Sequence, residues 1–242
     1  MSSFIKKNIP NTLTCGNLFS GCVATTFALA GNPEWALTWI IIGAVFDFFD
    51  GMSARLLKVS SPIGKELDSL ADDVTFGVAP SCMIFWQLGV VEYPDSLNSI
   101  RMIIPFVAFV MAAFSGLRLA KFNIDKRQTT SFIGLPTPAN ALFWGALINF
   151  NPRWINESFS WITIIIMVFL ASWLLVSEIP MFALKFKHWG WKGNEVRYSF
   201  IILAVILIIF MGVLSSWWLI ILCYLIISLY LDVRKKPSDK ER

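Results

Sequence analysis

Residues 47–72 decide the fold and read DFFDGMSARLLKVSSPIGKELDSLAD. Asp47 and Asp50 are three positions apart, a spacing that places two side chains on one face of a helix. Asp68 and Asp72 are four positions apart and share a face for the same reason. The stretch therefore predicts two successive helices, each of which presents a pair of carboxylates.

The break between these two helices is expected at Ser60-Ser61-Pro62. A serine oxygen caps the free amide groups at the start of a helix, and proline is favoured at the first helical position because its missing N–H is not needed there. We therefore expect Ser61 to be the N-cap and Pro62 to be the first residue of the second helix.

The whole chain is strongly apolar. Of its 242 residues, 56% are hydrophobic and 15% are charged, whereas soluble domains carry about 25% charged residues. A helix crosses a bilayer with about 20 apolar residues. We expect an all-α fold, a polytopic membrane helix bundle of about eight transmembrane helices. The expected spans are approximately residues 11–31, 35–56, 66–90, 101–122, 135–150, 159–184, 197–213 and 215–232.

The basic residues indicate the orientation of such a bundle. Eight spans divide the loops into two sets, and 18 of the 20 lysine and arginine residues fall in the set that contains both termini. Loops rich in lysine and arginine remain in the cytoplasm. We therefore expect an integral protein of the cell (inner) membrane, with both termini and the four aspartates on the cytoplasmic side. The net charge of +4 follows from this topology and gives no indication of nucleic-acid binding.

Four carboxylates in or near a membrane need a positive partner. One charged side chain at the bilayer centre costs about 2.5–3.5 kcal/mol, and clustered carboxylates also repel one another. Oxygen ligands suit hard divalent ions, and the single histidine of the chain excludes a zinc site built on histidine. Four carboxylates on two facing helices predict a site for two such ions, an arrangement suited to phosphoryl transfer. An aspartate-lined divalent cation transporter is the alternative from another class, but it would not need Gly51, Arg55 and Gly64.

The same stretch resembles the signature of the CDP-alcohol phosphotransferase family, D-x2-D-G-x2-A-R-x8-G-x3-D-x3-D. All fixed positions match: Asp47, Asp50, Gly51, Ala54, Arg55, Gly64, Asp68 and Asp72. The resemblance implies a six-helix catalytic core that opens to the cytoplasm, and it suggests a homodimer. The expected division of the chain is a catalytic core at 1–196, two additional spans at 197–232 and a cytoplasmic tail at 233–242.

The resemblance also implies roles for these residues. Two divalent metal ions, Mg²⁺ or Mn²⁺, would be held by Asp47, Asp50, Asp68 and Asp72. Asp72 would also be the general base, whereas Asp73 lies about 100° further around the helix and is expected to face water or to support the site from outside. The residues expected at the CDP group are Asp50, Gly51, Ala54, Arg55, Gly64 and Asn17.

Two further stretches resemble the phosphatidylserine synthase branch of this family. Residues 115–123 read SGLRLAKFN, in which Lys121 departs from the usual arginine but keeps its charge, and residues 131–139 read SFIGLPTPA. The opening pattern of Asn11, Thr14 and Asn17 also looks like the first helix of that branch. The serine-binding candidates are Arg118, Lys121, Asn11 and Thr14.

Each group of acceptor candidates has an ordinary alternative role. Arg118 suits a carboxylate because a guanidinium can form two parallel hydrogen bonds to it, but Arg118 and Lys121 also fit simple cytoplasmic charge. Asn11, Thr14 and Asn17 also fit hydrogen bonding between helices. We expect the second stretch mainly to shape the entry to the fifth span.

The expected function is transfer of the phosphatidyl group from CDP-diacylglycerol to the hydroxyl of L-serine, giving phosphatidylserine and CMP. The signature contains no cysteine, histidine or evident serine nucleophile, which favours direct transfer over a covalent intermediate. The alternative within the family is glycerol 3-phosphate as the acceptor, giving phosphatidylglycerol phosphate.

Overall fold

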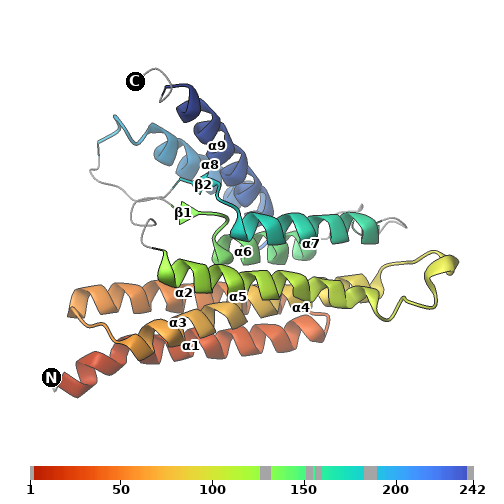
Figure 1. Cartoon of the computed structure of the whole chain (residues 1–242), viewed down its shortest axis with the longest axis horizontal. Helices are drawn as coiled ribbons and strands as arrows, with labels where there is room; N and C mark the ends of the chain where they lie inside the picture. Colours follow the sequence, from red (N-terminus) through yellow and green to blue (C-terminus); the bar gives the residue numbers. More distant parts are fainter. Residues whose placement is uncertain (1–2, 126–131, 151–154, 156–159, 183–189, 239–242) are drawn as a thin grey trace.

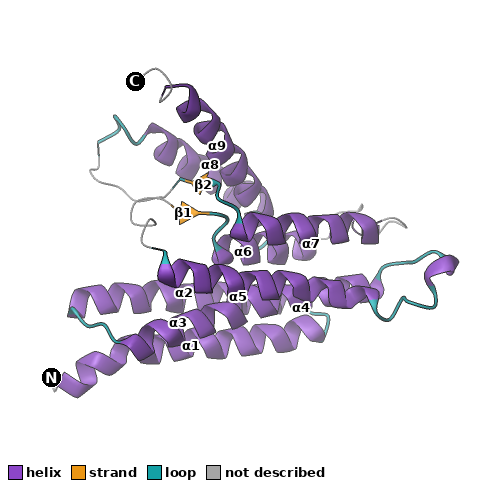
Figure 2. Ribbon diagram, viewed as in Figure 1, coloured by secondary structure: helices purple, strands orange, loops and turns teal. Residues whose placement is uncertain are grey.

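The protein is described by a computed structural model that covers residues 3–125, 132–150, 155, 160–182 and 190–238. Helices dominate, and two paired strands of two residues each are the exception (Figures 1 and 2). The α-helices are α1 (Ser3–Leu29), α2 (Pro33–Leu57), α3 (Pro62–Asp72), α4 (Ala79–Val90), α5 (Phe109–Ile124), α6 (Thr137–Phe150), α7 (Ser160–Val176), α8 (Glu195–Met211) and α9 (Trp217–Ser238). The remaining elements are the π-helix η1 (Asp73–Val78), the 3-10 helices η2 (Asp95–Leu97) and η3 (Ile104–Ala108), and the strands β1 (Phe132–Ile133) and β2 (Pro180–Met181). The expected all-α class is confirmed.

Every expected span contains a helix, but the sixth is shorter than predicted. The prediction extended it to residue 184, whereas α7 ends at Val176. Pro180 follows soon after, and β2 turns back to pair with β1, with Ile133 opposite Pro180 and Phe132 opposite Met181. Proline supplies no N–H to continue a helix, so the prediction was wrong at this end of the span. Ser131 and residues 239–242 lie outside the described residues.

Two helices among the described residues are long and apolar enough to cross a membrane. They comprise Asn8–Leu29 and Ile104–Ile124, while Ser160–Val176 and Trp217–Val233 are apolar but shorter. Length and composition therefore single out the first and fourth of the expected spans.

The helices pack in two groups. In Figure 1, α1, α2, α4, α5 and α7 run along the long axis of the molecule, whereas α8 and α9 cross it steeply. The larger group surrounds a core that includes Phe76, Met83 and Trp144. A second core, which includes Phe200 and Tyr224, joins α8 and α9 to the segments around β2.

The turn between α2 and α3 has the predicted form. Lys58 ends α2 in a left-handed conformation, with φ 52° and ψ 43°. Ser61 is the N-cap of α3, where its Oγ accepts a hydrogen bond from the Gly64 N–H over 3.0 Å, and Pro62 is the first helical residue. This cap starts α3 beside α1 and brings the second pair of aspartates back toward the first.

Candidate active site

Three aspartates from two helices meet in one cluster. Asp47 and Asp50 come from α2 and Asp68 comes from α3, and one carboxylate oxygen from each lies within 4.8 Å of the others. The three-residue spacing on α2 and the tight turn before α3 account for this meeting. The predicted approach of the two carboxylate pairs is thus observed for three of their four members.

The chemistry of this cluster fits a divalent cation. Its ligands are all oxygen atoms, which hard ions prefer. Asp68 Oδ1 is buried and has no hydrogen-bond partner. Within the part of the chain that the structure describes, no lysine or arginine forms an ion pair with these carboxylates. Their negative charge therefore lacks a cation from the described residues, and three aspartates are placed so that they can hold a metal ion.

Asp72 lies at the end of α3, just outside this three-aspartate cluster. The Asn17 side chain on α1 donates a hydrogen bond from Nδ2 to Asp72 Oδ1 over 3.0 Å. The carboxylates of Asp47, Asp68 and Asp50 are near enough to repel that of Asp72. Asp72 thus borders the cluster while an amide on another helix fixes one of its oxygens.

A π-helix begins directly after Asp72 and was not predicted from the sequence. In η1, the Thr75 hydroxyl donates a hydrogen bond to the Asn17 main-chain oxygen over 3.0 Å. Glycines on α1 and α2 leave room for Thr75, because a Cβ on Gly21 would collide with Thr75 Oγ1 and one on Gly43 would lie 2.6 Å from Thr75 Cγ2. Wide turns of this kind often occur at functional sites. Here Thr75 of η1 binds the main chain of Asn17, the residue whose side chain donates a hydrogen bond to Asp72.

Asp73 points away from the cluster. A Cβ on Gly77 would lie 2.7 Å from Asp73 Oδ1, and one on Gly116 of α5 would lie 3.3 Å from Asp73 Oδ2. The Asp73 carboxylate therefore lies against α5, whereas Asp72 faces Asn17 on α1. The neighbouring acid is half-buried, so it does not simply face water.

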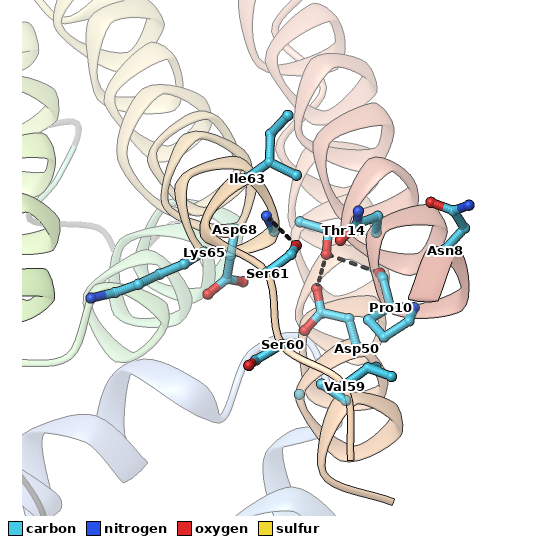
Figure 3. Close-up of a pocket in the computed structure, with 14 residues that line it drawn as sticks. Asn8, Pro10, Thr14, Asp50, Val59, Ser60, Ser61, Ile63, Lys65 and Asp68 are labelled. Atoms are coloured by element: carbon cyan, nitrogen blue, oxygen red, sulfur yellow. Dashed lines mark hydrogen bonds between the residues drawn. The ribbon is translucent and has the colours of Figure 1, made fainter. Parts of the chain in front are cut away.

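A cavity of about 490 Å³ adjoins the cluster and is bordered by α1, α2 and α3 (Figure 3). Seven of the predicted residues are among those that line it: Asn11, Thr14, Asp50, Gly51, Ala54, Gly64 and Asp68. The Thr14 hydroxyl lies 2.6 Å from Asp50 Oδ2 and 3.0 Å from the Pro10 carbonyl oxygen, contacts drawn as dashed lines in Figure 3. The signature residues thus form one wall of a cavity large enough for part of a substrate.

The two signature glycines differ in what surrounds them. A Cβ on Gly51 would meet nothing within 4 Å, whereas one on Gly64 would lie 2.8 Å from Asn11 Oδ1 and 2.9 Å from Ser61 Oγ. A side chain at position 64 would therefore have to displace Asn11 and Ser61, whereas position 51 has room for one. The bare backbone of Gly51 keeps cavity space open.

Two expected CDP-binding residues are not among those that line this cavity. Arg55 is exposed, and its Nε donates a hydrogen bond to the Gly51 carbonyl oxygen over 3.0 Å. Asn17 is fully buried and binds Asp72. The structure therefore places Arg55 at the rim and Asn17 beneath the cluster.

A second cavity, of about 360 Å³, contains the other acceptor candidates. It is lined by Arg118, Lys121, Ile124, Asp125, Ile133, Leu175, Val176, Ser177 and Glu178. Arg118 is buried, its Nε has no hydrogen-bond partner, and its guanidinium is near enough to Asp72 for their charges to interact. The four serine-binding candidates are therefore divided, with Asn11 and Thr14 at the first cavity and Arg118 and Lys121 at the second.

The stretch that contains Gly134 packs against the end of α7, and Ile133 of this stretch lines the second cavity. Gly134 has φ of +72°, and a Cβ there would lie 2.6 Å from the Leu175 carbonyl oxygen. Its N–H donates a hydrogen bond to the Ile179 carbonyl oxygen over 2.9 Å, and the Leu135 N–H donates one to that of Leu174 over 2.9 Å. The end of α7 is thereby fixed against β1.

Comparison with known proteins identifies the family. The family model for CDP-alcohol phosphatidyltransferases matches residues 7–173. A protein of Bacillus subtilis (strain 168) named CDP-diacylglycerol–serine O-phosphatidyltransferase is 41% identical over 130 residues, which cover 54% of this chain and 69% of the relative. Relatives of the same name are 30% identical over 244 residues in Mycobacterium tuberculosis (strain ATCC 25618 / H37Rv), covering 90% of this chain and 75% of the relative, and 37% identical over 142 residues in Saccharomyces cerevisiae (strain ATCC 204508 / S288c), covering 52% and 48%. The matched region contains the aspartate cluster, the lining of the first cavity and the whole signature, and the chain therefore belongs to the CDP-alcohol phosphatidyltransferase family.

Proposed function

We propose that this protein transfers the phosphatidyl group from CDP-diacylglycerol to the hydroxyl of L-serine, giving phosphatidylserine and CMP. The observation that carries the proposal is the position of Arg118. It lines the second cavity, and its guanidinium is close enough to Asp72 for their charges to interact. A guanidinium is suited to the carboxylate of an amino acid, and the relatives reported above are named CDP-diacylglycerol–serine O-phosphatidyltransferases.

The donor side of the site is the first cavity. The CDP group would lie over Asp50, Gly51 and Gly64, with the acyl chains in the surrounding lipid. Asp47, Asp50, Asp68 and Asp72 would hold two divalent ions, Mg²⁺ or Mn²⁺, which when bound neutralise the pyrophosphate and stabilise the departing CMP. The open space beside Gly51 lets the nucleotide approach the backbone.

The acceptor side is the second cavity, where the charge of Arg118 is close enough to interact with that of Asp72. Asp72 would take the proton of the serine hydroxyl, and the serine oxygen would attack the phosphorus that carries diacylglycerol. The bond from that phosphorus to CMP then breaks, and no covalent enzyme intermediate forms. A correctly positioned general base accelerates such a step about 10²–10⁴-fold. Asn17 would hold Asp72 in the orientation needed.

The surface of the bundle supports its placement in a membrane. On α7, Ile166, Phe169 and Trp173 are more than half exposed, at 60%, 53% and 55%. Contiguous apolar surface of this kind is covered in native proteins by a partner or by lipid. We propose that all eight helical segments cross the inner membrane, with both termini and the site at the cytoplasmic face, where Lys58, Lys65 and Lys121 also lie.

The last two spans lie outside the proposed catalytic core. The core is residues 1–196, the family match ends at residue 173, and α8 and α9 contribute no residue to either cavity lining. We propose that residues 197–232 are peripheral or form the contact of a homodimer, and that 233–242 are a cytoplasmic tail.

An acceptor screen tests the proposal. Purified protein supplied with CDP-diacylglycerol and Mg²⁺ should form phosphatidylserine with L-serine and no phosphatidylglycerol phosphate with glycerol 3-phosphate. The opposite product pattern would assign the chain to the glycerol phosphate branch. Metal flux across vesicles without CMP release would instead indicate a cation transporter.

A further inference from the structure

We infer that Glu178, at the end of α7, binds the ammonium group of the acceptor amino acid while Arg118 binds its carboxylate. The inference rests on the proposed function, because it assigns the second half of an amino-acid site in the cavity already given to the acceptor.

The second cavity carries charges of both signs. Arg118 and Lys121 come from α5, whereas Glu178 lies just after α7, and all three line the cavity. A zwitterion such as serine presents a carboxylate and an ammonium group a few bonds apart and needs both kinds of partner. Glycerol 3-phosphate carries only negative charge, and a glutamate in the cavity wall would repel it. The lining therefore suits an amino acid better than a phosphorylated alcohol.

The end of α7 adds to the negative character of the wall that contains Glu178. Leu175 and Val176 are the last two residues of α7, and Ser177 follows them. All three line the cavity beside Glu178. The carbonyl end of a helix carries a partial negative charge that favours cations. The ammonium group of an acceptor would thus meet a carboxylate and a helix end of the same sign.

Glu178 is held in a defined place by the stretch that contains Gly134. The hydrogen bonds from Gly134 to Ile179 and from Leu135 to Leu174 fix the chain on both sides of Glu178. This close approach requires a glycine, since a Cβ at position 134 would collide with the Leu175 carbonyl oxygen. Gly134 would therefore serve acceptor selection although it does not itself line the cavity.

Asp125 also lines the cavity, but its position is less suitable. It follows α5 and comes four residues after Lys121, so it lies on the wall that already supplies the cations. Glu178 approaches from a different element, and an acceptor can then be held between Arg118 and Glu178.

The test compares Glu178→Gln with Glu92→Gln in purified, full-length protein. Glu92 is an exposed acid that follows α4 and lines neither cavity. Figure 1 shows the loop after α4 at the end of the bundle far from β2. Losing a charged hydrogen bond is expected to raise the KM for L-serine at least about tenfold in Glu178→Gln, with kcat within about twofold and the KM for CDP-diacylglycerol unchanged. Glu92→Gln should behave as the wild type, and Glu178→Asp should recover part of the serine affinity.

A second acceptor distinguishes a loss of acceptor selectivity from general damage to the fold. 3-Hydroxypropanoate has the hydroxyl and carboxylate of serine but no ammonium group. Glu178→Gln should lower the ratio of kcat/KM for serine to that for 3-hydroxypropanoate at least about tenfold, whereas damage to the fold would lower both values in parallel. An unchanged serine KM, or a parallel loss, would overturn the inference in a protein that still makes phosphatidylserine. If the wild type makes no phosphatidylserine, the proposed function fails instead.

Discussion

The Asn17 amide on α1 donates a hydrogen bond to the Asp72 carboxylate at the end of α3, with 3.0 Å between Nδ2 and Oδ1. The main-chain oxygen of Asn17 in turn accepts a hydrogen bond from Thr75 in the π-helix. The first helix is thereby tied to the residue that we assign as the base, on both sides of the point where the α-helix changes to a π-helix. This relationship makes Asp72 and its neighbour Asp73 an informative pair.

Asp72→Asn should lower turnover by at least about 100-fold, because an amide cannot take the serine proton. Binding of CDP-diacylglycerol should persist, since Asp47, Asp50 and Asp68 remain together. Asp73→Asn is the matched control and should keep most activity, because that side chain lies against α5. Steady-state turnover and lipid binding measure the two effects, and near-normal turnover in Asp72→Asn would refute the base assignment.

Removal of divalent ions should stop the reaction. Chelation with EDTA is expected to abolish turnover, and Mg²⁺ or Mn²⁺ should restore it, because no lysine or arginine among the described residues forms an ion pair with the three-aspartate cluster. Asp68→Asn should raise the metal concentration needed for half-maximal activity. Activity that survives exhaustive chelation would reject the metal site.

The two signature glycines should respond differently to alanine. Gly51→Ala meets nothing within 4 Å, so the thermal midpoint should hold while the KM for CDP-diacylglycerol rises as the methyl group occupies cavity space. Gly64→Ala would displace Asn11 and the Ser61 cap and should cost about 0.5–2 kcal/mol of stability. Thermal unfolding in detergent and donor KM distinguish the variants, and equal destabilisation by both would contradict the structure.

Gly43→Ala should damage the support of Asp72 from a distance. Its methyl group would lie 2.6 Å from Thr75 Cγ2 and 2.9 Å from Asn17 Oδ1, and such overpacking costs about 1–3 kcal/mol. A Cβ on Gly89 in α4 would meet nothing within 4 Å, so Gly89→Ala should raise the free energy of unfolding by up to about 1 kcal/mol through helix propensity. A Gly43→Ala protein as stable and as active as the wild type would show that Thr75 and Asn17 are not held as described.

Arg118→Ala should act on the acceptor alone. The KM for L-serine is expected to rise about 10–150-fold through loss of a charged hydrogen-bonding partner, with the KM for CDP-diacylglycerol unchanged. Lys121→Ala should have a smaller effect, because Lys121 is exposed whereas Arg118 is buried. An unchanged serine KM in Arg118→Ala would reject the carboxylate clamp.

Local rules predicted much of the site. The spacing of Asp47 and Asp50, and the cap formed by Ser61 and Pro62, are encoded within a few residues, and the structure agrees with both. The signature also anticipated the wall of the first cavity, because those positions share helix faces that meet once α3 folds back.

Features that depend on distant contacts were not predicted. The π-helix after Asp72 depends on Thr75 packing against Gly21 and Gly43, which lie on two other helices. The early end of α7 depends on pairing of β2 with β1, more than 40 residues earlier in the chain. The division of the serine candidates between two cavities likewise follows from helix packing, which a periodic pattern on one helix does not report.

The most direct test of the central claim follows CMP and phosphatidylserine together in a single-turnover reaction. Protein in excess over CDP-diacylglycerol, with Mg²⁺ present, should release almost no CMP until L-serine is added. Serine should then produce CMP and phosphatidylserine at equal rates and in a one-to-one ratio. Release of one CMP per site before serine is added would contradict direct transfer, and CMP release without phosphatidylserine would contradict serine as the acceptor.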